Sequence, residues 1–122
     1  MPSHRTERLN SDFRREIAMI ITRMKDPRIS SLLEVVRVRV TSDLSYAKVY
    51  IASVGGGEEA AEACKVLKSA EGYIKTELAH TMKNIRKIPS LDFVPDDSVD
   101  YYNRIDSILK GLKTDGNTED QS

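Results

Sequence analysis

Basic side chains gather in two parts of the chain, in numbers that suit the binding of phosphate groups. Residues 65–87 hold six Lys and Arg against two Asp and Glu, and residues 1–28 hold seven against four. The chain as a whole has 122 residues and a formal net charge of zero, because its other segments are acidic. A polyanion responds to local potential and not to net charge. The two basic segments are therefore candidate phosphate-binding surfaces, and the alternative is that they are only solvated helix faces.

The second basic segment places its cations beside an apolar stripe. Ile74, Leu78 and Ile85 recur at helical spacing and predict a buried helix face. On a helix continued through this segment, Lys75 and Arg86 would point nearly the same way. Such a row can follow a phosphate backbone, and without an aromatic pair beside it we expect recognition of shape over base sequence. The cations that we expect to contact phosphates, including two from the first helix, are Arg8, Arg15, Lys68, Lys75, Lys83, Arg86 and Lys87.

The other chemically suggestive residues favour structural interpretations. The glycines 55–57 precede a helix, but the glutamates that follow them would repel a phosphate. His4 and His80 have no second ligand at zinc-like spacing, and Cys64 lies on an apolar helix face. No nucleophile, base and orienting group form a set. We therefore expect no catalytic residue, no metal and no other cofactor, and an enzyme remains an alternative only by analogy with small α+β hydrolases.

Bulk properties predict one cytoplasmic domain. No stretch reaches the length of a membrane span, and the amino terminus has no apolar run typical of a secretory signal. A single cysteine fits a reducing compartment. We expect a folded domain over residues 1–112 and a disordered tail over residues 113–122, which has little to bury.

The spacing of apolar residues predicts the order helix, strand, strand, helix, helix, strand. Two of the predicted strands are joined by the short turn "SDLS" and should form an antiparallel hairpin. Three strands with helices on one face make an α+β sandwich. The predicted helices span residues 6–25, the segment from the triple glycine to Gly72, and the segment from Gly72 to Pro89. The predicted strands span 36–41, 47–51 and 90–94. An optional last helix runs from Ser98 to Leu112.

Several segments together resemble one family, ribosome-binding factor A. They are "RTERLNSDFRREIAMIITRMKDPRI", "VTSDLSYAKVYIAS", "LKSAEGYIKTELAHTMKNIRKIPSLDF" and "PDDS". The resemblance implies a KH domain of the second type, with an Ala-x-Gly interruption between two helices in place of the usual GXXG loop. This interruption falls on Ala70 and Gly72. We expect Gly72 to supply the backbone freedom of a bend and Ala70 to allow close approach of a helix or an RNA backbone, so both are expected at the RNA-binding site.

The resemblance also implies a function. It implies a non-enzymatic RNA-binding factor that binds the immature small ribosomal subunit and assists maturation of its ribosomal RNA, including 5′-end processing, with importance for growth in the cold. It further implies release by a GTPase partner. We expect a monomer without membrane contact. Two alternatives remain: a KH-like RNA binder outside ribosome assembly, and a protein–protein adaptor that uses the face of the hairpin between Val36 and Ile51.

Overall fold

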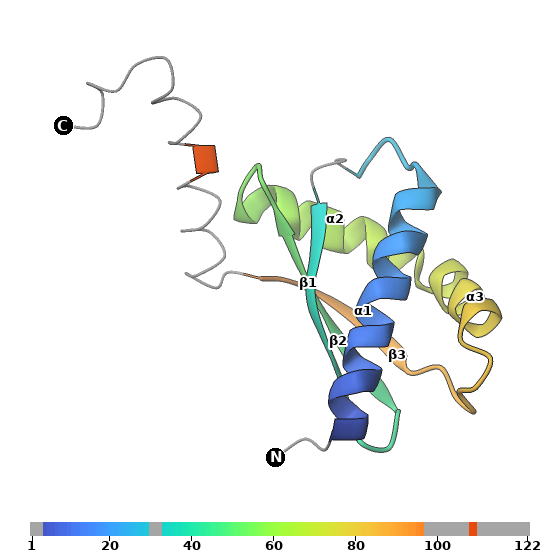
Figure 1. Ribbon diagram of the computed structural model, residues 1–122. Helices are drawn as coiled ribbons and strands as arrows, with labels where there is room; N and C mark the ends of the chain where they lie inside the picture. Colours follow the sequence, from blue (N-terminus) through green and yellow to red (C-terminus); the bar gives the residue numbers. More distant parts are fainter. Residues whose placement is uncertain (1–3, 30–32, 97–107, 110–122) are drawn as a thin grey trace.

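Three helices and a three-stranded mixed sheet make up the described part of the protein (Figure 1). The computed structural model describes residues 4–29, 33–96 and 108–109. The element order matches the order expected from the sequence. The elements are α1 (His4–Met24), β1 (Leu33–Val40), β2 (Tyr46–Ser53), α2 (Gly57–Ser69), α3 (Glu71–Thr81) and β3 (Ser90–Pro95).

Helix α1 forms because its apolar residues fall on one side at helical spacing. Phe13, Ile17 and Ile20 are completely buried. The helix ends at Met24 because Lys25 adopts a left-handed backbone with φ of 52°. Pro27, two residues further on, is typical of the region just after a helix end. The helix expected over 6–25 is therefore confirmed, with ends shifted by one or two residues.

Strands β1 and β2 form the antiparallel hairpin that the alternating residues predict. Val38 pairs with Val49 in the middle of the ladder, and both side chains are buried. The register shifts between Val35 and Arg37, so Val36 is the extra residue of a bulge. The turn between the strands holds Leu44 at a φ of 60°.

Strand β3 adds to the sheet beside β2 and runs parallel to it, with Leu91 opposite Ala47. A parallel neighbour requires a long crossover, which α2 and α3 supply. Leu91 and Phe93 point to the same side as the buried residues of β2. The third strand expected over 90–94 is thus confirmed and is one residue longer.

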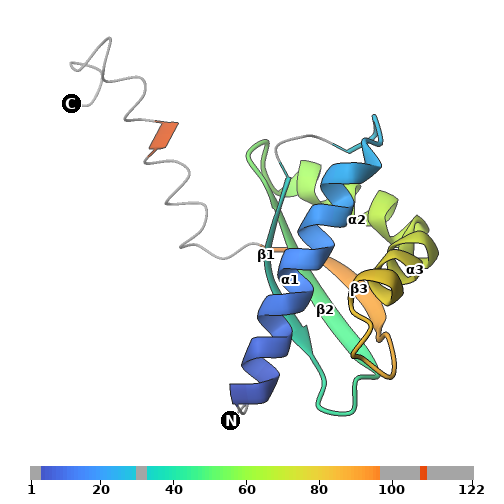
Figure 2. The same cartoon turned by 45° about the vertical axis from the view of Figure 1, so that its right-hand side comes forward.

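The helices cover one face of the sheet, as expected. Helix α1 packs on β1, α2 packs on β2 and β3, and α3 lies against α1 (Figures 1 and 2). Small residues of α2 allow close contact with the sheet, and Cys64 is one of the buried side chains there. Desolvation by burial raises the pKa of the Cys64 thiol to about 11. Its interpretation as a small core residue is confirmed.

The helix expected from Gly72 to Pro89 is longer than the helix that the structure contains there. Helix α3 ends at Thr81, and Met82 has φ of −116° and ψ of 65°. The apolar residues Ile85 and Ile88 still pack on the core, but they do so from an irregular segment. Apolar spacing alone does not distinguish a helix from a segment whose side chains turn inward at similar intervals. This segment is needed because the chain must travel from the end of α3 to the start of β3.

The expected carboxyl-terminal helix and the tail over residues 113–122 lie outside the described residues, apart from 108–109. Among the helices that the structure describes, none is both long enough and apolar enough to cross a membrane.

Candidate nucleic-acid interface

Ala70 separates α2 from α3 and interrupts what the sequence presents as one long helical region. Its backbone has φ of −99° and ψ of 12°, and its N–H is directed to the carbonyl groups of Val66 and Leu67 at 3.2 and 3.0 Å. The chain changes direction at this point (Figures 1 and 2). The expected interruption at the Ala-x-Gly motif is confirmed, and Ala70 is the residue at which it occurs.

The expectation that Gly72 supplies the non-helical backbone of the bend is wrong. Gly72 lies inside the first turn of α3, and its carbonyl accepts a hydrogen bond of 2.9 Å from the Thr76 hydroxyl. Among the described glycines, only Gly56 has a positive φ. A Cβ at Gly72 would meet no atom within 4 Å. The bend therefore does not require glycine here, and the missing side chain instead leaves the backbone of α3 open to close approach.

Two side chains on either side of Ala70 hold the edge of strand β3. The Lys68 ammonium donates to the Leu91 carbonyl at 3.1 Å and to the Glu71 carboxylate at 2.9 Å. The other Glu71 oxygen accepts a hydrogen bond of 2.7 Å from the Leu91 N–H. The hydrogen bond with Glu71 raises the pKa of Lys68. Lys68 thus has a structural partner on both sides and keeps one N–H for an outside acceptor.

Lys75 lies one turn after Glu71 on α3 and is half-buried. Burial alone would raise the pKa of Glu71, but the hydrogen bonds from Lys68 and Leu91, together with the charges of Lys68 and Lys75, lower it. Lys68, Glu71 and Lys75 therefore form one electrostatic cluster beside the break at Ala70. The stretch from Lys68 to Lys75, which holds this cluster, contains four of the expected site residues: Lys68, Ala70, Gly72 and Lys75.

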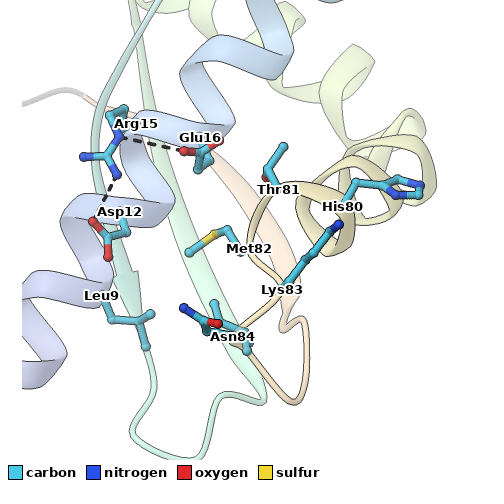
Figure 3. A pocket seen from close by; sticks show the side chains of 10 residues that line it. Leu9, Asp12, Arg15, Glu16, His80, Thr81, Met82, Lys83 and Asn84 are labelled. Atoms are coloured by element: carbon cyan, nitrogen blue, oxygen red, sulfur yellow. Dashed lines mark hydrogen bonds and ion pairs between the residues drawn. The ribbon is translucent and has the colours of Figure 1, made fainter.

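A second group of expected residues lies in a groove between α1 and the end of α3, which we call the α1/α3 groove. It has a volume of about 480 Å³ and is lined by Leu9, Asp12, Arg15, Glu16 and residues 80–85. Figure 3 shows Arg15 between Asp12 and Glu16 on the α1 side, with Lys83 on the opposite wall. The nitrogen–oxygen distances of the two Arg15 ion pairs are 3.3 and 3.8 Å. The pair with Asp12 is exposed on both sides and therefore weak, so it leaves Arg15 able to turn toward a phosphate outside the groove.

The segment after α3 carries the remaining cations. Lys83, Arg86 and Lys87 are all exposed there, while Ile85 and Ile88 pack against the core. Lys87 lies near the hairpin turn, where its charge contributes to the lowered pKa of Asp43. These three cations do not continue a helical row with Lys75, because α3 has already ended. Arg8 is exposed on α1, one turn before Asp12.

Apart from Arg8, the expected cations thus occupy two regions and not one helical row. One surrounds the break at Ala70, and the other includes the α1/α3 groove and the segment after α3. Both regions adjoin α3 or its continuation, but Lys75 and the residues of α3 that face α1, Tyr73 and Glu77, lie on different sides of the helix.

One basic region was missed from the sequence. Arg23, Lys25 and Arg28 line an open hollow of about 590 Å³ at the end of α1, with Tyr73 of α3 on its other side. Arg23 also forms an ion pair of 3.9 Å with Glu77. The positive charge of residues 1–28 was a usable signal, but the approach of Tyr73 depends on how α1 and α3 pack.

A local network of hydrogen bonds surrounds the glycines at 55–57. The Ser53 hydroxyl donates to the Glu59 carboxylate and accepts a hydrogen bond of 3.1 Å from the Gly55 N–H. A Cβ at Gly55 would collide with that carboxylate. Gly56 needs glycine because its φ is 108°. An acidic group thus stands where a phosphate would have to lie, which agrees with the structural interpretation of this loop.

The topology and the break between α2 and α3 define an α+β KH-like domain of the second type. The chain belongs to the ribosome-binding factor A family, because a family model of that description matches residues 5–109. Relatives named ribosome-binding factor A include one from Clostridium tetani, 40% identical over 93% of each chain. Another, from Brevibacillus brevis, is 36% identical over 100% of each chain.

Solved structures agree with this assignment. A crystal structure of ribosome-binding factor A from Thermus thermophilus is 31% identical, with a TM-score of 0.65 over 74% of this chain and 94% of that chain. A solution structure of a putative ribosome binding factor A from Thermotoga maritima is 28% identical, with a TM-score of 0.69 over 81% and 93%. A Thermus thermophilus homology model fitted into a map of a 30S complex is 32% identical, with a TM-score of 0.58 over 70% and 88%.

Proposed function

We propose that this protein is an assembly factor that binds the immature small ribosomal subunit and assists maturation of its ribosomal RNA. Family membership supports this proposal, as does the likeness to the Thermus protein fitted into a 30S complex. The proposal includes 5′-end processing of the RNA, importance for growth in the cold, and release by a GTPase. It also includes action as a cytoplasmic monomer that catalyses no reaction itself.

The observation that carries the proposal is the placement of an exposed cation, Lys68, and a half-buried one, Lys75, on the two sides of the Ala70 break, together with exposed cations along the segment after α3. Lys83, Arg86 and Lys87 are free to turn toward a phosphate backbone, because their side chains are exposed. Each cation that replaces a condensed counterion adds favourable entropy to binding. Next to the Ala70 break, the absence of a side chain at Gly72 leaves the backbone of α3 open at that position. Together they favour contact with a folded RNA surface through its phosphates.

Cosedimentation with immature small subunits tests this function. The protein should travel with the subunit, and nuclease treatment of the subunit RNA should release it. A variant with Lys83→Gln, Arg86→Gln and Lys87→Gln should bind more weakly at the same salt concentration. The matched control is Lys65→Gln on α2, since the Lys65 side chain is 79% exposed and belongs to neither region. Binding that survives both nuclease and the triple substitution would contradict the proposal.

A protein–protein adaptor is the second candidate function. It would bind through proteins of the subunit and not through RNA. An adaptor would stay bound to nuclease-treated subunits and would be lost only after the ribosomal proteins have been removed.

A KH-like RNA binder outside ribosome assembly is a separate alternative. Sequencing of the RNA that copurifies with the protein would identify it, because small-subunit RNA would then not be enriched.

A further inference from the structure

The outer face of the sheet, which points away from the helices, carries aromatic and basic side chains in alternation. Along β2, Lys48 lies between Tyr46 and Tyr50 on this face, whereas Ala47 and Val49 point inward and are buried. The register adds two arginines of β1, one opposite Tyr50 and one opposite Lys48. We call this set the outer sheet patch, and its members are Arg37, Arg39, Tyr46, Lys48 and Tyr50.

The patch contains a pair of like charges that folding alone disfavours. Arg39 and Lys48 are direct partners across the antiparallel ladder, and like charges in this position destabilise a sheet. In the described ranges, neither residue belongs to an ion pair within 4 Å. Asp92 of β3 is the direct partner of Lys48 in the parallel register, and Glu34 lies near the other end of β1. The three cations of the patch thus have two carboxylates near them. A bound anion would relieve the repulsion between Arg39 and Lys48.

The rings of the patch are placed for stacking. The Arg37 guanidinium carbon lies 4.3 Å from the centre of the Tyr50 ring, so the two planar groups already form one platform. Tyr46 is 61% exposed, which is unusual for a large ring in a strand. Two tyrosines four residues apart on one strand are separated by about 13 Å, and Lys48 lies midway between them along the strand.

We propose that the outer sheet patch binds an unpaired segment of RNA. Bases would stack on Tyr46 and on the Arg37–Tyr50 platform, while Arg39 and Lys48 contact the phosphates between them. This inference rests on the proposed function and extends it, because it gives the protein a second RNA contact on the face opposite the helices. The helical side would position the RNA surface through phosphates, and the patch would hold a single-stranded segment.

The chemistry of the patch favours RNA over an acidic peptide. Alternation of rings and cations along one strand matches a ligand that alternates flat bases and phosphates. An acidic peptide could pair with the cations, but its carboxylate side chains have no flat faces to stack on the tyrosine rings. Double-stranded RNA does not fit, because its bases are already stacked on each other. The patch should therefore prefer single strands.

Binding of two RNA probes tests the patch. A short oligouridylate should bind more tightly than an RNA hairpin of equal length. Tyr46→Leu with Tyr50→Leu should weaken oligouridylate binding by roughly tenfold or more, whereas the matching Phe variant keeps the rings and should bind like the parent. Equal binding by the Leu variant, or equal loss in the Phe variant, would overturn the inference.

A charge variant supplies a second measurement. Arg39→Gln with Lys48→Gln should lower the salt dependence of log K for oligouridylate by about 1.4, which corresponds to two phosphate contacts on a single strand. The same variant should melt no lower than the parent, because a like-charge pair has been removed. An unchanged salt dependence would overturn the inference, and Lys65→Gln serves as the control for general loss of charge.

The inference about the outer sheet patch and the proposed function can be contradicted independently of each other. If the parent binds small subunits but the Leu variant still binds oligouridylate normally, the patch is not an RNA site and the proposed function stands. If the parent does not bind small subunits, the proposed function fails, and the oligouridylate result still decides the patch. Capture of a subunit protein by the patch after nuclease treatment would also overturn the RNA assignment.

Discussion

Glu71 accepts a hydrogen bond of 2.7 Å from the backbone N–H of Leu91, a residue twenty positions further along the chain. Lys68 binds the carbonyl of the same residue, so side chains next to the Ala70 break satisfy both backbone groups of Leu91 at the outer edge of β3. At the opposite edge of the sheet, Asn10 of α1 accepts a hydrogen bond of 2.8 Å from the Val40 N–H of β1. Exposed strand edges invite aggregation, and here helix side chains cover backbone groups of Leu91 on one edge and Val40 on the other.

Glu71→Ala should therefore destabilise the protein. The Leu91 N–H would lose its partner, and an unsatisfied backbone donor costs about 1–3 kcal/mol in free energy of unfolding. Urea denaturation measures this change. Glu62→Ala on α2 is the control, because Glu62 forms only an exposed ion pair of 3.6 Å with Lys65 and its loss should cost less than about 0.5 kcal/mol. Similar costs for the two variants would contradict the role given to Glu71.

Gly72→Ala separates folding from binding. The position is helical and has room for a Cβ, so alanine should raise the free energy of unfolding by about 0.5–1 kcal/mol. If RNA approaches the backbone of α3 here, the added methyl group should weaken binding to the small subunit even though the protein is more stable. Thermal melting and cosedimentation measure the two effects. A variant that is more stable and binds normally would remove Gly72 from the interface.

The hairpin turn should become unstable in acid. Hydrogen bonds from Ser45 and Thr41 lower the pKa of Asp43 to about 2. A carboxylate with a lowered folded-state pKa stabilises the protein above its unfolded pKa of about 4, and this contribution is lost as pH falls toward 2. The difference in melting temperature between the parent and Asp43→Asn should therefore shrink between about pH 4 and pH 2. A difference that stays constant over this range would show that Asp43 is not responsible.

The sequence was sufficient for the elements with strong, regular patterns. Helix α1 has an uninterrupted apolar stripe, and β1 and β2 alternate around a short turn, so local physics determines both. The end of α3 could not be predicted in the same way, because Ile85 continues the helical spacing although it lies in an irregular segment. The cations after Thr81 were consequently assigned to a helix that does not reach them.

The site depended more on contacts between distant residues. Nothing in the local sequence indicates that Lys68 will bind the carbonyl of Leu91, twenty-three positions away. The interruption near Ala70 was expected, but glycine is the usual residue for an unusual backbone, and so the bend was placed on Gly72. Alanine can adopt the conformation observed at Ala70, since its φ is negative. The outer sheet patch likewise depends on the register that sets Arg39 opposite Lys48.

The central claim is that exposed cations around α3 bind phosphates of small-subunit RNA. The most direct measurement is the slope of log K against log salt concentration for binding to immature small subunits, compared between the parent and the variant with Lys83→Gln, Arg86→Gln and Lys87→Gln. Three lost phosphate contacts should make the slope shallower by roughly 2–3, the range between single-stranded and duplex nucleic acid. A variant with the slope of the parent would contradict the account.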